Sequence, residues 1–276
     1  MAYKTILVCL NEIERLPQLI AMARNLGVKF GAHITGLYVV PGVEVYPEPA
    51  SAVGASVYDG KRVYFQEKIS KIRSDFETAM KQDGLSFDFH DVDSIMPNIL
   101  QDVVEQSRSV DLIVVSATNR DKAVGVENDF VENLVIAAGR PVLILPFKGK
   151  SWPKMEEIVL AWDDSREASR TVFDGVPFMQ LAQRTHVVTF DPDGPGTVPG
   201  AAIAEALDRH GIKAKTMTMS SSGLGVGELL MRTAHDQGAG LIIMGAYGHS
   251  RFTEFVFGGA TRHIIRNLNI PVLMSH

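Results

Sequence analysis

The chain has 276 residues, of which 46% are hydrophobic and 21% are charged, and its formal net charge at pH 7 is -5. This composition excludes a largely disordered chain, and the acidic balance argues against a general affinity for nucleic acid or for anionic membranes. No segment has the apolar length of a membrane span, and the first apolar run is too short for a signal peptide, so we expect a cytoplasmic protein.

The first half of the chain alternates short apolar runs with amphipathic stretches. The apolar runs predict strands near 4–10, 33–40, 85–92, 110–116 and 141–146. The stretches between them predict helices near 14–30, 60–83, 97–108 and 128–139. Continuous apolar runs of this length are typical of strands buried on both faces. We therefore expect βαβ units with a parallel sheet.

The single cysteine, Cys9, lies inside the first apolar run. One cysteine excludes an intramolecular disulfide, which is in keeping with a reducing compartment. We interpret Cys9 as a buried core thiol and not as a redox group, because burial suppresses formation of the thiolate.

Two irregular segments interrupt this pattern. Residues 41–60, rich in Pro, Gly, Ala, Ser and Val, form either a lid or a surface insertion. Residues 146–153 combine Gly, Pro and Lys, which predicts a short solvated linker.

The second half repeats the organisation of the first. Strands are predicted near 156–162, 184–190, 212–219, 239–245 and 271–275, and helices near 165–182, 199–210, 226–237 and 258–268. Three strand-like blocks recur in the same order, namely 6–11 with 158–163, 110–116 with 239–245, and 141–144 with 271–274. One unit has therefore been duplicated, and we expect domains at 1–147 and 154–276.

The most informative motif follows the apolar run 239–244. Gly245 and Gly248 are separated from Gly258 and Gly259 by a segment that ends at a predicted helix start. A strand that leads into glycines and then into a helix presents backbone N–H groups to a phosphate. We expect Gly245 and Gly248 to take positive φ and to let phosphates approach the backbone; the alternative is that they only make a tight turn.

This arrangement resembles the universal stress protein family in its tandem form. Family members with a nucleotide site show G-x-x-G, nine residues and G-[S/T] after the fourth strand, with an Asp at the end of the first. Gly245, Gly248, Gly258 and Asp163 match that pattern. The resemblance implies an α/β fold of two tandem doubly wound domains, each a five-stranded parallel sheet flanked by helices, of the adenine nucleotide alpha hydrolase type. It implies ATP, or ADP or AMP, carried with Mg²⁺.

Further contacts are carried over from the resemblance. Asp163 faces the nucleoside, or else caps the following helix. Backbone groups of Val188, Thr189 and Met244 bound the adenine pocket. His249 either reaches a phosphate or is an exposed loop histidine.

The next helix start would complete the phosphate site. The first turn of this helix holds Gly258, Gly259, Ala260 and Thr261, whose free N–H groups attract an anion. Gly259 stands where the family has Ser or Thr, while Thr261 keeps a hydroxyl on that turn. The preference among tri-, di- and monophosphate is therefore left open.

The first half departs from the motif at every glycine. It aligns Ser116, Asn119, Asn128 and Asp129 with the four glycines, and Asn11 with the strand-end Asp. Asp129 would place a carboxylate where a phosphate should lie. We expect a degenerate first domain with a structural or regulatory role.

The sequence does not indicate an enzyme. It has no nucleophile elbow, no Walker A lysine and no nameable general base, and only Arg251 and Arg262 lie near the motif. We expect a nucleotide-responsive stress-response module with at most slow hydrolysis. The alternatives are an ATP-using ligase or pyrophosphatase, which would need a Ser-Gly-Gly loop that is absent, and an interaction scaffold with purely structural glycines.

The sequence also limits which metal ions and protein partners we expect. The eight histidines show no zinc spacing. The strands near 141–146 and 271–275 are short and flanked by Pro, as sheet edges are. In the family such edges pair between domains, which implies an internal pseudo-dimer, and two chains can associate further as a homodimer.

Overall fold

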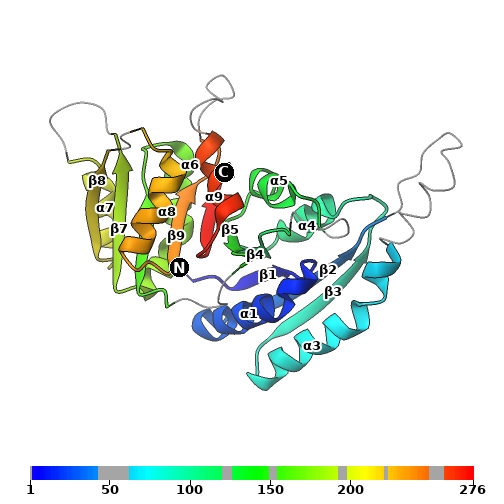
Figure 1. Cartoon of the computed structure of the whole chain (residues 1–276). Helices are drawn as coiled ribbons and strands as arrows, with labels where there is room; N and C mark the ends of the chain where they lie inside the picture. Colours follow the sequence, from blue (N-terminus) through cyan, green and yellow to red (C-terminus); the bar gives the residue numbers. More distant parts are fainter. Residues whose placement is uncertain are drawn as a thin grey trace, which may run out of the picture. The chain divides into compact units, whose positions relative to one another are not determined.

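The computed structural model describes residues 2–42, 62–119, 126–148, 154–191, 198–220, 223–248 and 258–276. The chain divides into two compact units. The first unit is Tyr3–Arg140, and the second consists mainly of Pro141–His276. Figure 1 shows the helices and strands of both units.

The first unit is a parallel sheet covered by helices on both faces. In chain order its elements are β1 (Thr5–Cys9), η1 (Ile13–Arg15), α1 (Leu16–Phe30), β2 (His33–Val40), α3 (Ile69–Gln82), β3 (Phe87–Asp93), α4 (Leu100–Ser107), β4 (Leu112–Ser116) and α5 (Phe130–Ala137). The strand order is β3-β2-β1-β4, with every pair parallel. Helix α1 packs with α3, and α4 packs with α5, on opposite faces of the sheet (Figure 1).

The second unit has the same winding with two strands more. Its elements are β5 (Val142–Leu145), β6 (Glu157–Ala161), α6 (Arg166–Leu181), β7 (Arg184–Phe190), α7 (Ala201–Arg209), β8 (Ala214–Met219), α8 (Val226–Asp236), β9 (Leu241–Gly245), α9 (Gly258–Asn267) and β10 (Val272–Ser275). The strand order is β5-β10-β9-β6-β7-β8. All neighbours are parallel except β5, which runs antiparallel to β10 with Leu143 opposite Leu273.

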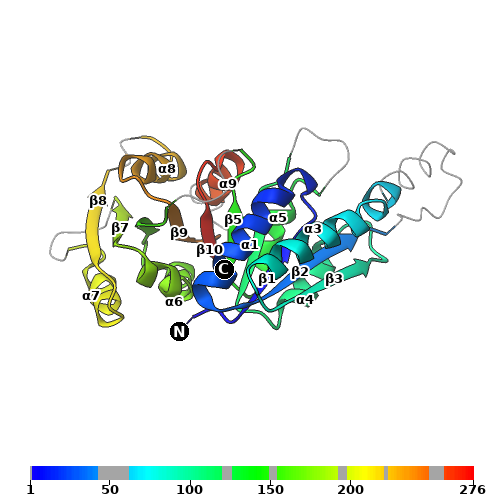
Figure 2. The ribbon, with the colours of Figure 1, turned by 90° about the horizontal axis from the view of Figure 1, so that it is seen from below.

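These elements confirm the predicted α/β fold, and every predicted strand is present within three residues of its expected ends. The cores of the strands are apolar and buried because both faces of each sheet are covered; Ile6, Val8, Leu241 and Ile243 have no exposed surface. Figure 2 shows the helices of the second unit on both sides of its strands.

The division between the units falls after Arg140, before the segment that the sequence suggested as a linker. Strand β5 is the last strand of the first sequence repeat. It nevertheless belongs to the second unit, because it pairs with β10. The predicted pairing of the two short edge strands is therefore present. Residues 43–60 of the predicted insertion, and 149–153 of the predicted linker, lie outside the described residues.

Cys9 is buried, as expected. Burial raises the pKa of its thiol from the ordinary 9.0 to about 12, so the thiolate is essentially unpopulated at neutral pH. Among the described residues, no helix is both long and apolar enough to cross a membrane.

Strand order determines where a ligand can bind in such sheets. In each unit the direction of winding reverses at the central strand, between β1 and β4 and between β6 and β9. Ligands of open α/β sheets bind at such a switch point, outside the carboxyl ends of the strands. The carboxyl end of β9, where the glycine motif begins, is therefore the candidate site.

Candidate functional site

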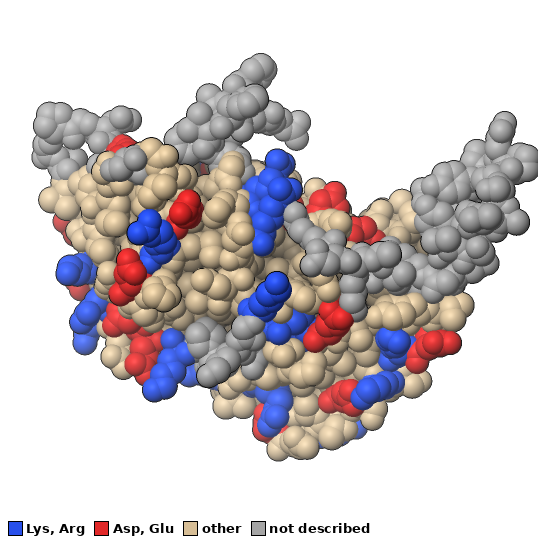
Figure 3. Space-filling model, viewed as in Figure 1, with Lys and Arg blue, Asp and Glu red and all other residues tan. Residues whose placement is uncertain are grey.

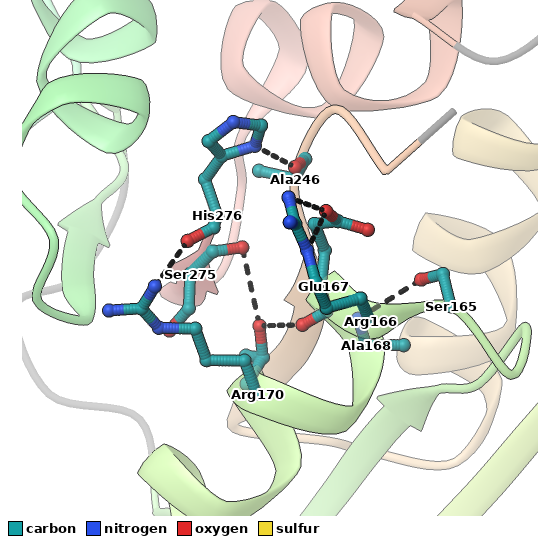
Figure 4. A network of polar contacts seen from close by, with 9 residues as sticks. Ser165, Arg166, Glu167, Ala168, Arg170, Ala246, Ser275 and His276 are labelled. Atoms are coloured by element: carbon teal, nitrogen blue, oxygen red, sulfur yellow. Dashed lines mark hydrogen bonds and ion pairs between the residues drawn. The ribbon is translucent and has the colours of Figure 1, made fainter. Parts of the chain in front are cut away.

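The turn after β9 lies directly against the first turn of α6 (Figure 4). A Cβ added to Gly245 would come within 2.6 Å of the Ala168 amide nitrogen. A Cβ added to Gly248 would lie 2.9 Å from Glu167 Oε2 and 3.1 Å from Ser165 Oγ. Gly245 is thus needed for the close approach of the turn to the α6 backbone, whereas a side chain at Gly248 would have to displace the ends of the Glu167 and Ser165 side chains.

The conformation of this turn differs from the expectation. Among the described residues, the positive φ falls on Tyr247, at 56°, and neither Gly245 nor Gly248 has a positive φ. The prediction that these glycines supply left-handed backbone was therefore wrong. Their lack of a Cβ serves packing against α6.

Strained backbone is concentrated at this edge of the second unit. Among the described residues, the non-glycine positive φ values belong to Asp164, Asp191 and Tyr247. These residues follow β6, β7 and β9 respectively, so all three lie at the carboxyl ends of neighbouring strands. Such strain costs about 1–3 kcal/mol per residue and clusters at binding sites.

Thr189, the expected adenine neighbour, lies near the end of β7. It is 8% exposed, and its Oγ1 is buried without a hydrogen-bond partner among the described residues. The carbonyl of the neighbouring Val188 accepts a bond of 2.9 Å from the Trp162 N–H. A buried hydroxyl without a partner is costly, and this one lies at the edge predicted to receive a nucleoside.

Asp163 is exposed at the carboxyl end of β6. Its Oδ1 accepts a bond of 3.1 Å from the Ser165 N–H, which closes a local turn. The cap of α6 is Ser165, whose Oγ accepts from the Ala168 N–H at 3.1 Å. The alternative reading of Asp163 as the helix cap was therefore wrong.

Met244 lies in β9, directly before the glycine turn. Its side chain is 6% exposed, and its backbone lies in β9 opposite Met274 of β10. The contribution of the Met244 main chain to an adenine pocket stays a prediction.

The start of α9 is tied to the same turn. Thr261 is 3% exposed, and its Oγ1 accepts from the Tyr247 N–H at 3.4 Å, so this hydroxyl links the turn to the helix. Gly259 has no atom within 4 Å of an added Cβ, and a Cβ added to Gly227 of α8 would lie 3.0 Å from the Ala260 carbonyl oxygen. Gly258 begins the helix, whereas His249 lies outside the described residues.

Sequence reasoning missed Glu167. This side chain is almost fully buried in the first turn of α6, and its Oε1 accepts from the Arg166 guanidinium at 2.7–2.9 Å. Acidic residues are common in the first turn of helices, so the sequence carried no signal that this one would lie beside the glycine turn.

The end of β10 is joined to the same region (Figure 4). His276 Nδ1 lies 2.9 Å from the Ala246 carbonyl oxygen, and the His276 carbonyl accepts from Arg170 at 2.9 Å. Thr171 Oγ1 donates to the Glu167 carbonyl at 2.8 Å. Helix α6, the glycine turn and β10 therefore form one hydrogen-bonded assembly.

The corresponding edge of the first unit is filled. Asn11, the counterpart of Asp163, is 2% exposed; it donates from Nδ2 to the Val39 carbonyl at 2.6 Å and accepts from the Val39 N–H at 3.0 Å. The registers of the paired strands place Tyr38 where the second unit has Thr189. Tyr38 is fully buried and donates to the Phe65 carbonyl at 3.0 Å.

The motif positions of the first unit are likewise engaged locally. Ser116 donates to the Ala117 carbonyl, Asn119 to Glu14, and Asp129 accepts from Asn133. The cavity at the ends of β1 and β4 measures about 10 Å³, which holds no more than one water molecule.

Charged side chains of both signs interleave on the face seen in Figure 3. Among the described residues, no group of three His, Cys, Asp or Glu side chains is placed to hold a metal by itself.

Comparisons with known proteins agree with this fold. The model of the universal stress protein family matches residues 155–276. A curated universal stress protein from Synechocystis is 26% identical over 147 residues, which is 52% of this chain and 49% of the relative. The match thus spans about half the length of that relative.

Two solved structures cover nearly the whole chain. A universal stress protein from Archaeoglobus fulgidus has a TM-score of 0.70 at 17% identity, covering 98% of this chain and 95% of that one. A protein of unknown function from Pseudomonas aeruginosa has a TM-score of 0.61 at 16% identity, covering 99% and 92%. At this identity the likeness shows the fold.

Proposed function

Because residues 155–276 match the model of the universal stress protein family, we propose that the second unit binds an adenine nucleotide at the carboxyl ends of β6, β7 and β9. ATP is the first candidate, with ADP and AMP as alternatives. The protein then acts as a cytoplasmic stress-response module whose state depends on the nucleotide.

The observation that carries this proposal is the unpartnered Thr189 hydroxyl. It lies near the carboxyl end of β7, and Asp164, Asp191 and Tyr247, which follow β6, β7 and β9, have positive φ at the same edge of the sheet. At the equivalent position of the first unit, Tyr38 fills the space and bonds Phe65. The proposal therefore assigns one nucleotide to each chain.

We propose a binding role in preference to an enzymatic one. Phosphoryl transfer requires cations that stabilise the transition state and a group that orients the nucleophile. Near the glycine turn, Arg166 pairs with Glu167, and Arg170 donates to the His276 carbonyl. Any hydrolysis is then slow.

A second candidate is an interaction scaffold that needs no nucleotide. One observation favours it: Gly245 and Gly248 are both explained by their packing against α6. This candidate leaves the Thr189 hydroxyl without an explanation.

Calorimetric titration of nucleotide-stripped protein with Mg-ATP separates the two. We expect one site per chain in the wild type and loss of binding in Gly248→Val, whose side chain meets Glu167 and Ser165. Gly225→Val is the matched control, because nothing lies within 4 Å of a Cβ at Gly225. Absence of heat in the wild type, with no nucleotide co-purifying, would favour the scaffold.

A further inference from the structure

The Glu167 carboxylate occupies an unusual position for a site that receives phosphates. Its side chain is 6% exposed, and Oε1 is bonded to Arg166. The other oxygen, Oε2, lies 2.9 Å from the point where a Cβ of Gly248 would stand. Among the described residues no donor bonds Oε2, and Figure 4 shows it without a contact.

The charge around this turn opposes a bare phosphate. Asp163 and Asp164 follow β6 immediately before α6, and Glu167 is in its first turn. The guanidinium of Arg166 is 84% exposed and already paired with Glu167. A phosphate held on the Gly248 backbone would lie close to an incompletely neutralised, buried carboxylate, where repulsion is screened less than in water.

Glu167 and Ser165 are suited to bind a cation that arrives together with the phosphate. Mg²⁺ is usually held by one or two carboxylates together with substrate phosphate oxygens, and not by a complete protein cage. Glu167 Oε2 is such a carboxylate oxygen, and Ser165 Oγ, 3.1 Å from the same Cβ position, supplies a neighbouring hydroxyl.

We propose that Glu167 is the protein's ligand for a divalent cation carried on the phosphates, so that the glycine turn accepts a cation-loaded nucleotide and rejects a bare one. This inference rests on the proposed function. It assigns to Glu167 the role of selecting the form of the nucleotide.

The test is a set of calorimetric titrations of nucleotide-stripped full-length protein with ATP. Three conditions are compared: EDTA, excess Mg²⁺, and cobalt(III) hexammine, which supplies charge but no open coordination position. The wild type should bind Mg-ATP at least about tenfold tighter than ATP in EDTA. Cobalt(III) hexammine should restore only part of that difference.

Glu167→Gln should bind ATP in EDTA more tightly than the wild type does, and its ratio between Mg²⁺ and EDTA should fall toward one. Glu205→Gln is the matched control, because Glu205 is exposed on α7 and pairs only with Arg209 among the described residues. If Glu167→Gln does not fold, Glu167→Asp retains the charge but withdraws it by one methylene, and an intermediate ratio is expected.

Two outcomes separate this inference from the proposed function. Equal binding with and without Mg²⁺ in the wild type, or an unchanged ratio in the Glu167 variants, overturns the role of Glu167 and leaves nucleotide binding intact. No binding by the wild type in any condition overturns the proposed function and this inference with it.

Discussion

At the scale of single residues, the two repeats differ through a few substitutions that change what one edge of the sheet can hold. Asn11 is buried and bonds both main-chain groups of Val39, whereas Asp163 is exposed and accepts from the Ser165 N–H in a local turn. Tyr38 is packed and satisfied where Thr189 is not. At this edge of the sheet, the Tyr38 hydroxyl of the first unit is therefore hydrogen-bonded, whereas the Thr189 hydroxyl of the second unit has no partner among the described residues.

Reciprocal exchange of the strand-end residues tests this difference. Asn11→Asp replaces the donor that faces the Val39 carbonyl with a buried carboxylate, and we expect a loss of about 3 kcal/mol in the free energy of unfolding. Asp163→Asn is at an exposed position and should change stability by less than about 0.5 kcal/mol while weakening nucleotide binding. Urea unfolding and calorimetry measure the two effects, and a stable Asn11→Asp would contradict the structural role of Asn11.

At the scale of elements, the close approach of β9 to α6 is what shapes the candidate site. Helix α6 packs on both β9 and β10, and Gly245 lies where the helix begins. The first turn of α6 therefore supplies the groups beside the glycine turn, Ser165 and Glu167 among them. The loop after β9 alone does not define the site.

A pair of glycine substitutions tests this packing. Gly245→Ala places a methyl group 2.6 Å from the Ala168 nitrogen, and we expect it to destabilise the protein by about 1–3 kcal/mol. Gly259→Ala, in open space in the first turn of α9, should be neutral or stabilise by up to about 1 kcal/mol. The midpoints of urea denaturation compare the stabilities of the two variants. Equal midpoints would show that β9 can move away from α6 to accommodate the added methyl group.

At the scale of the whole molecule, pairing of the short edge strands occurs within one chain. Strand β10 has β9 on one side and β5 on the other, so neither of its edges is open to a second copy. Because both of its edges are paired, β10 offers no template for association between chains.

Light scattering should therefore give the mass of one chain, 30.2 kDa. A mass twice as large would mean that a homodimer forms through a surface other than β10. Repeating the measurement with Mg-ATP tests whether association depends on the nucleotide.

The sequence by itself determined the duplicated α/β organisation, the positions of the strands and helices, and the edge at which the glycine motif lies. These properties follow from local patterns: the apolar run 239–244 predicts a buried strand wherever it is placed. Repetition of such runs in the same order predicts the duplication. The buried state of Cys9 followed in the same way.

Only the tertiary structure decided what the motif residues contact. Gly248 faces Glu167, Thr261 bonds Tyr247, and β5 joins β10, all through contacts between residues distant in sequence. The positive φ at Tyr247 likewise depends on how the turn is held between α6 and α9. Spacing along a chain records which residues lie near a strand end, but the side chain that faces each of them is determined by packing between separate elements.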